Sequence, residues 1–189
     1  MTLLVLASQS PRRRELLSQI DVAHEVIHVD VDETPHQGES PQNYVQRITL
    51  AKARAGHEQM PDRPILAADT CVVIKNRILG KPEDEEHAVH MLKQLSGTTH
   101  QVLTGVALFH AGAEHYQLNH NEVRFCTIST VQARHYWATG EPADKAGGYA
   151  VQGRGALFIE YISGSYSGIM GLPLFETGQL LAKAGLLRV

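Results

Sequence analysis

The stretch LLVLASQSPRRRELL, Leu3 to Leu17, decides how the rest of the chain is arranged. Its apolar beginning predicts a short buried strand. Pro11 predicts the first position of a helix, with Ser10 before it as the N-cap residue. The small polar residues between these elements predict a turn, so strand, turn and helix follow one another directly.

Three consecutive arginines, Arg12, Arg13 and Arg14, lie in the first turn of this predicted helix. Each cation there is unfavourable by about 0.3–1 kcal/mol, because a helix N-terminus carries a partial positive charge. An anion resolves the conflict, since Ser8, Ser10, the free N–H groups of the helix and the guanidinium groups of Arg12 and Arg13 form a phosphate cradle. The alternative is a solvated basic turn without a ligand.

Pro64 to Ile74, PILAADTCVVI, predicts a central strand that carries Asp69 and Thr70 in its middle. An unpaired buried carboxylate is costly, so Asp69 is expected to face a metal ion, a basic side chain or an open cleft. The alternative is that Asp69 ends the strand early and caps a turn. Gly80-Lys81-Pro82 follows as a turn after a predicted hairpin, which would bring Lys81 near the Asp69 strand.

Other segments alternate between helical and strand patterns along the chain. Strands are predicted at Val22 to Val29, Gln101 to Phe109, His115 to Thr127 and Ala156 to Ser163. Helices are predicted from Pro41 (with Ser40 as N-cap), at Glu83 to Leu95, at Gln132 to Thr139 and from Pro173, after a Gly/Ser turn at Gly164 to Gly171. This order predicts an α/β fold with a mixed sheet flanked by helices, rather than an all-parallel sheet.

The composition is that of an ordinary globular chain of 189 residues, so we expect one domain over residues 1–189. A net charge of −3 argues against a nucleic-acid polymer as partner. No apolar run reaches the ~18 residues of a membrane helix, and the N-terminal pattern is not that of a signal peptide. Cys71 and Cys126 are too few for a disulfide framework, which favours a cytoplasmic location. A homodimer is left open by the sequence.

Asp144 to Phe158, DKAGGYAVQGRGALF, is rich in glycine but matches neither common nucleotide-loop pattern. It fails the P-loop pattern because Gly153 is followed by Arg154-Gly155 instead of Lys and Ser or Thr. It fails the dinucleotide pattern because Phe158 takes the third glycine position. What remains is a backbone that is able to approach a ligand closely.

Several short motifs follow one another along the chain in a specific order and spacing. They are Ala7-Ser8-x-Ser10-Pro11-Arg12-Arg13, Asp32-Glu33, Ala51-Lys52-Ala53, Ala68-Asp69-Thr70, Gly80-Lys81-Pro82, Ser96-Gly97, Asp144-Lys145-Ala146-Gly147 and Gly171-Leu172-Pro173-Leu174. Through them the chain resembles the Maf family of nucleoside triphosphate pyrophosphatases over essentially its whole length. One departure is Gln9, a turn position where related members often carry Gly or Thr.

The resemblance implies an α/β fold similar to the inosine triphosphate pyrophosphatases, with a cleft between two lobes. It implies hydrolysis of a nucleoside triphosphate to the monophosphate plus pyrophosphate, with a divalent metal cation, Mg²⁺ or Mn²⁺. The implied roles are phosphate binding by Ser8, Ser10, Arg12 and Arg13, charge supply by Lys52 and Lys81, metal binding by Glu33 and Asp69, and proton abstraction by Asp69. Asp30 and Asp32, by contrast, are expected in a solvated loop.

Arg12, Thr70 and Gln152 resemble the specificity residues of the dTTP/UTP pyrophosphatases. The subgroup specific for 7-methyl-GTP instead has Trp, Gln and Glu at these places, so that specificity is the alternative. Gln152 carries both a donor and an acceptor and is expected to pair with the edge of uracil or thymine. Thr70 and Arg12 would offer further donors nearby.

A protein of another class remains to be weighed against the enzyme. The family name comes from an association with septum formation. The alternative function is therefore a nucleotide-binding regulator of cell division with little turnover. Such a binder needs the basic cradle but has little need for both Glu33 and Asp69. Because both acids are present, we favour the enzyme.

Overall fold

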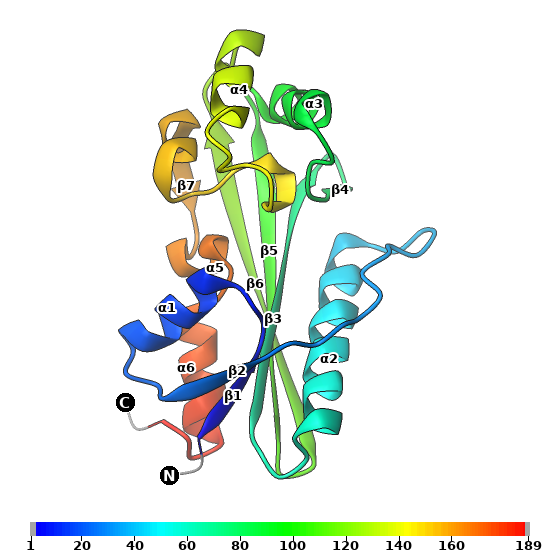
Figure 1. Ribbon diagram of the computed structural model, residues 1–189, viewed down its shortest axis with the longest axis vertical. Coiled ribbons are helices and arrows are strands. Elements are labelled where there is room, and N and C mark those ends of the chain that lie inside the picture. Colours follow the sequence, from blue (N-terminus) through cyan, green and yellow to red (C-terminus); the bar gives the residue numbers. More distant parts are fainter. Residues whose placement is uncertain (1–2, 188–189) are drawn as a thin grey trace.

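Seven strands form one mixed sheet in the computed structural model, which describes residues 3–187 (Figure 1). The strands are β1 (Leu4–Ala7), β2 (His24–Ile27), β3 (Ile65–Ile74), β4 (Arg77–Leu79), β5 (Thr99–His110), β6 (Ala113–Phe125) and β7 (Ile159–Ser163). Their order is β2-β1-β3-β5-β6-β7, with β4 paired to β3. β1 is parallel to β2 and β3, and every other pair is antiparallel, so the predicted mixed α/β sheet is confirmed.

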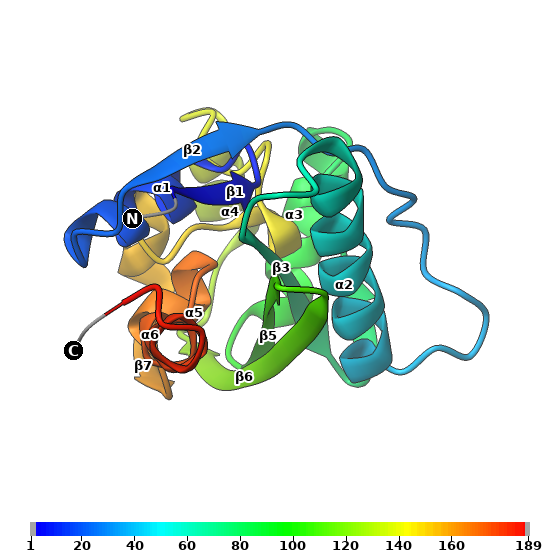
Figure 2. The same ribbon diagram turned by 90° about the horizontal axis from the view of Figure 1, so that it is seen from below.

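Helices cover both faces of this sheet (Figure 2). They are α1 (Pro11–Gln19), α2 (Pro41–Gln59), α3 (Glu85–Leu95), α4 (Thr130–Trp137), α5 (Tyr166–Met170) and α6 (Leu174–Lys183), with 3₁₀ turns η1 (Ala146–Gly148) and η2 (Gly153–Phe158). α2 lies along one face of β3 and β5, while α5 and α6 lie on the opposite face. No helix in residues 3–187 is long and apolar enough to cross a bilayer.

The long strands β3, β5 and β6 run through two lobes of the molecule (Figure 1). β1, β2, α1, α2, α5 and α6 gather at one end, and α3, α4, β4 and β7 gather at the other. Two tight turns join neighbouring antiparallel strands, and the first of them confirms the hairpin predicted before Gly80. Lys75 and Asn76 between β3 and β4, and Ala111 and Gly112 between β5 and β6, all have positive φ, as a type I′ turn requires.

The ladder between β1 and β3 is only two residue pairs long, and this leaves an opening along one edge of β3. β1 pairs with β3 only at Val5↔Ile65 and Leu6↔Leu66, and β4 joins the same edge of β3 only from Val72 onward. Residues 67–71 of β3 therefore have no strand partner on that edge among the described residues. Because β1 separates from β3 after Leu6, both faces of β3 around Asp69 become reachable from one cleft.

Three of the predicted segments differ from the structure in instructive ways. The strand predicted at Ala156 to Ser163 begins only at Ile159, because the preceding residues form η2. The Gly/Ser turn predicted at Gly164 to Gly171 contains α5, whose first turn is capped by the Ser165 side chain accepting from the Gly168 N–H. α3 begins at Glu85 rather than Glu83, since the Asp84 carboxylate accepts from the His87 N–H and sets the N-cap there.

Candidate active site

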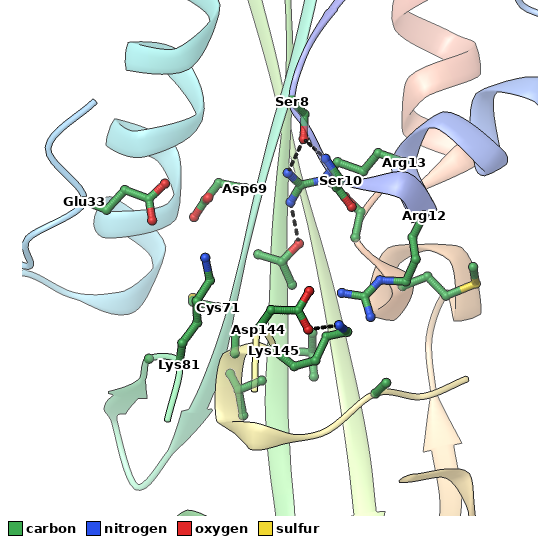
Figure 3. A pocket seen from close by; sticks show the side chains of 18 of the residues that line it. Ser8, Ser10, Arg12, Arg13, Glu33, Asp69, Cys71, Lys81, Asp144 and Lys145 are labelled. Atoms are coloured by element: carbon green, nitrogen blue, oxygen red, sulfur yellow. Dashed lines mark hydrogen bonds and ion pairs between the residues drawn. The ribbon is translucent and has the colours of Figure 1, made fainter. Parts of the chain in front are cut away.

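A cavity of about 960 Å³ opens between the two lobes, at the free edge of β3. One wall comes from the turn after β1, the other from Gly80 and Lys81 and from the segment Asp144–Val151. Asp69 and Thr70 lie between these walls (Figure 3). The volume is at the upper end of the usual range for small-molecule sites, about 300–1,000 Å³, and therefore suits a ligand as large as a nucleotide.

Arg13 is held by three separate groups in the cleft (Figure 3). Its Nε donates to the Gly171 carbonyl at 2.7 Å, its Nη1 donates to Ser8 Oγ at 3.0 Å, and its Nη2 donates to Thr70 Oγ1 at 3.3 Å. Gly171 has φ +117°, a backbone conformation that other residues rarely adopt, and this brings its carbonyl to the guanidinium. One N–H on each terminal nitrogen is left over for a ligand.

The turn after β1 presents hydrogen-bond donors to the cavity. Ser8 Oγ accepts from Arg13 and from the Ser10 N–H at 3.3 Å, so its own hydrogen is its remaining means of bonding to a ligand. Ser10 is at the N-cap position of α1 as predicted, but its side chain makes no capping hydrogen bond. The first turn of α1 is therefore not satisfied by its cap and is available to an anion.

Lys52 joins two acidic residues from different elements. Its ammonium group lies 2.6 Å from Glu33 Oε1 and 2.7 Å from Asp69 Oδ1. Lys52 comes from α2, Glu33 from the loop after β2 and Asp69 from the middle of β3. The structure thus brings together three residues of the sequence prediction that lie far apart in the chain.

Burial and charge act in opposite directions on the two carboxylates. Burial raises the pKa of Asp69, and the nearby charges of Lys52 and Arg13 lower it by less, so the net shift is upward. Glu33 is also subject to a burial effect that raises its pKa, but the hydrogen bond from Lys52 and the charges of Lys52 and Lys81 outweigh it, so the pKa is lowered. The two carboxylates are therefore shifted in opposite directions, Asp69 toward the protonated form and Glu33 toward the ionised form.

The acid pair fits a hard divalent cation that is shared with a ligand. No group of three or more His, Cys, Asp or Glu side chains within residues 3–187 is arranged to hold a metal ion. Mg²⁺ is commonly bound by one or two carboxylates together with substrate phosphates, which needs only Glu33 and Asp69 from the protein. Both oxygens lie on one ammonium group, so the two carboxylates are close enough to share a cation.

Lys81 and Arg12 point into the cavity from opposite lobes (Figure 3). The Lys81 ammonium group points toward the region between Glu33 and Asp69. The Arg12 guanidinium points toward the ion pair that Asp144 forms with Lys145. Arg12 Nε is buried and has no hydrogen-bond partner among the described residues, and burial lowers the pKa of this side chain.

The glycine-rich segment is fastened by Glu141. The Glu141 carboxylate accepts from the N–H groups of Arg154 at 2.9 Å and Gly155 at 3.0 Å, and from the Tyr136 hydroxyl at 2.7 Å. Gly153 has φ +82°, and a Cβ there would lie 2.5 Å from Glu141 Oε2, so the turn requires glycine. Val151 lines the cavity, whereas the adjacent Gln152 is not among its lining residues.

Most of the predicted site residues meet in this one cavity. Its lining includes Ser8, Ser10, Arg12, Arg13, Glu33, Lys52, Asp69, Thr70 and Lys81. Asp144 and Lys145 line it too, although the sequence analysis assigned them no role. The available indication was the motif Asp144-Lys145-Ala146-Gly147, which begins the glycine-rich segment.

The loop between β2 and α2 is fixed by two residues of α2. Tyr44 Oη donates to the Glu33 carbonyl at 3.0 Å, and Arg47 donates to both carboxylate oxygens of Glu39 at 2.7 Å. Asp30 and Asp32 are exposed in this loop, which confirms the prediction that they are solvated. The loop therefore holds the Glu33 backbone in place at the cavity.

Comparison with known proteins agrees with this arrangement. Residues 3–184 match the family model described as "Maf-like protein". A protein of Alkalilimnicola ehrlichii named "dTTP/UTP pyrophosphatase" is 53% identical over 182 residues, covering 93% of this chain and 90% of its own. A protein of Saccharophagus degradans with the same name is 54% identical and covers 94% and 87%.

Solved structures are more distant. The Ham1 protein of Staphylococcus aureus is 17% identical, with a TM-score of 0.43 over 67% of this chain and 72% of its own, a value too low to establish a shared fold. The family match is decisive, because it covers the cradle, the acid pair and the glycine-rich segment together. The chain belongs to the Maf family.

Proposed function

We propose that the protein hydrolyses dTTP and UTP to the nucleoside monophosphate and pyrophosphate. The observation that carries this proposal is the meeting of Glu33, Asp69 and Lys52 beside a cationic phosphate cradle. Relatives about 50% identical over nearly the full chain carry the name dTTP/UTP pyrophosphatase. A nucleotide-binding regulator would have little need for this acid pair.

A nucleoside triphosphate carries about four negative charges, and phosphoryl transfer depends mainly on positioning and electrostatic stabilisation. Arg13 has two N–H groups left for phosphate oxygens, and Ser8 has its hydroxyl hydrogen. Ser10, Arg12 and the first turn of α1 complete the cradle from the same side. Lys81 approaches from the other lobe, so positive charge surrounds the triphosphate.

Glu33 and Asp69 would hold the divalent cation, Mg²⁺ or Mn²⁺, through their carboxylate oxygens. The cation supplies charge neutralisation at the phosphate oxygens when it is bound. The Lys52 ammonium group bridges the same two carboxylates. Lys52 therefore keeps the acids together, and its charge also reaches the phosphate region.

Asp69 is the residue we assign to proton abstraction. A water oxygen forms a bond to phosphorus as Asp69 takes a proton from that water. The bond between the attacked phosphorus, α or β, and the oxygen that bridges them breaks. The other product leaves with that oxygen, so the products are the nucleoside monophosphate and pyrophosphate. Its raised pKa suits Asp69 to this role better than Glu33, whose pKa is lowered.

Base choice is assigned to the part of the cavity that is lined by Arg12 and by the segment Asp144–Val151. Gln152 follows Val151 directly and would turn its amide toward the edge of uracil or thymine when nucleotide is bound. Specificity for 7-methyl-GTP is the alternative. Of the two, the names of the relatives support dTTP and UTP.

The test is an assay of pyrophosphate release from a panel of nucleoside triphosphates with Mg²⁺ or Mn²⁺. We expect dTTP and UTP to have the highest kcat/KM. Binding of these nucleotides without pyrophosphate release would instead indicate a regulator, and a preference for 7-methyl-GTP would reassign the subgroup.

Three further expectations accompany this function. A cytoplasmic location is supported by the two free cysteines, Cys71 and Cys126. A single domain over residues 1–189 is supported by the strands that run through both lobes, and limited proteolysis tests it. A homodimer remains a prediction, which sedimentation equilibrium tests.

A further inference from the structure

A chain of hydrogen bonds leads from Arg13 into the interior, on the face of β3 opposite Asp69. Arg13 Nη2 donates to Thr70 Oγ1 at 3.3 Å, and Thr70 Oγ1 lies 3.0 Å from Thr104 Oγ1. Thr104 Oγ1 then donates to the Gly168 carbonyl at 2.7 Å. Thr104 lies in β5, is fully buried and is not among the residues that line the cavity.

The direction of every hydrogen in this chain follows from its two ends. A threonine hydroxyl has one hydrogen, and the Gly168 carbonyl has none, so the hydrogen of Thr104 points to Gly168. Thr70 must therefore donate to Thr104. This leaves only lone pairs on Thr70 Oγ1 for Arg13, whose guanidinium group offers only N–H donors.

We propose that Thr104 is a positioning residue that keeps Arg13 in the phosphate cradle. This inference rests on the proposed function, because it assigns Arg13 to the phosphates. Thr104 acts through two routes. It fixes the hydroxyl direction of Thr70, and it binds Gly168 of α5, the helix whose C-cap residue Gly171 accepts from Arg13 Nε through its carbonyl.

The same series of hydrogen bonds changes the role that is expected for Thr70. The sequence suggested that its hydroxyl would donate to the base, but that hydrogen is committed to Thr104. Thr70 consequently acts on the phosphate side, by accepting from Arg13. A defect in the chain should then weaken binding of every nucleoside triphosphate by the same factor, whatever its base.

The experiment compares the wild type with Thr104→Val, which keeps the side-chain shape and removes the hydroxyl. Inorganic tripolyphosphate binding, measured by calorimetry, should weaken about tenfold, and KM for UTP, CTP and GTP should rise by the same factor. The kcat should change far less, and Thr104→Ser should restore binding. Thr49→Val is the matched control, because Thr49 is equally buried but donates to the Val45 carbonyl within α2.

Two results would overturn the inference. One is unchanged tripolyphosphate affinity in Thr104→Val, and the other is a changed UTP-to-GTP ratio with unchanged tripolyphosphate affinity, which would place Thr70 on the base. If Thr104→Val does not fold, Thr70→Val breaks the chain one bond closer to Arg13 and carries the same expectation. Tripolyphosphate binding needs no turnover, so a wild type that binds it but releases no pyrophosphate refutes only the proposed function.

Discussion

The ammonium group of Lys52 lies 2.7 Å from Asp69 Oδ1, which pairs a lysine of α2 with a carboxylate in the middle of β3. Both side chains are nearly buried, with 12% and 11% exposure. A buried carboxylate that is retained in a strand needs such a partner, because it would otherwise become protonated. The pair places the Asp69 carboxylate, which can accept a proton, and the Lys52 ammonium group together at the open edge of the sheet.

Asp69→Asn should lower kcat by roughly 100-fold or more, since it removes the assigned base and a metal ligand while keeping the side-chain shape. Steady-state pyrophosphate release and a melting curve measure the two effects separately. Wild-type kcat in the variant would show that Asp69 is a structural residue.

Activity should stop in excess EDTA and return when Mg²⁺ or Mn²⁺ is added, because Glu33 and Asp69 alone hold a cation weakly. Glu33→Gln should raise the Mg²⁺ concentration for half-maximal rate by about tenfold or more. The exposed Asp32, in the same loop, provides the control Asp32→Asn, which should leave this titration unchanged. Full turnover in EDTA would exclude the proposed metal dependence.

Replacing Lys81 should affect activity alone, whereas replacing Lys52 should affect both activity and stability. Lys81 is exposed, so Lys81→Ala should lower kcat/KM about tenfold with an unchanged melting temperature. Lys52→Ala leaves Asp69 and Glu33 without their shared cation and should also lower the free energy of unfolding by about 1–3 kcal/mol. Equal stability losses in the two variants would contradict this distinction.

Base choice should change when the three predicted specificity residues are replaced together, with Arg12 and Gln152 acting on the base and Thr70 acting on the phosphates through Arg13. Replacing Arg12, Thr70 and Gln152 by Trp, Gln and Glu should reduce the UTP-to-GTP ratio of kcat/KM more than it reduces stability. In the single variant Gln152→Ala, the loss should appear in KM for UTP while inorganic tripolyphosphate binding stays unchanged. If Gln152→Ala raises KM for all nucleotides by the same factor, Gln152 does not contact the base.

Stability should fall in mild acid because of His100. Burial lowers the pKa of this histidine to about 4, and its Nε2 lies 2.7 Å from the Tyr149 hydroxyl. The unfolded chain takes up a proton as the pH falls through about 6.5, whereas the folded chain does so only near the lowered value. The contribution of neutral His100 to the free energy of unfolding is therefore fully present above pH 6.5 and is lost as the pH falls toward 4.

Urea unfolding at pH 7 and pH 5 measures this effect. Between these values the wild type should lose about 2 kcal/mol that His100→Gln does not lose. His90→Gln, on the exposed side of α3, is the control and should behave like the wild type. The same pH dependence in His100→Gln would assign the acid sensitivity to other groups.

Local sequence features determined much of the fold. The apolar run before Ser8, the Ser40-Pro41 helix start and the Lys75-Asn76 turn each act through neighbouring residues, so their outcomes were readable in the chain. The wrong boundaries, at η2 and α5, depend on remote groups. The Glu141 carboxylate holds the backbone of the segment that becomes η2, and the Gly168 carbonyl of α5 accepts from Thr104.

The sequence by itself also determined which chemical groups are present, namely a basic turn, two separate acids and several lysines. Only the tertiary structure decided which of them meet. β1 separates from β3 after Leu6, and this opens the edge where Asp69 faces Lys52 while Thr70 faces Arg13 on the other side. The direction of the Thr70 hydroxyl depends on Thr104, 34 residues away, because one hydroxyl hydrogen serves only one acceptor.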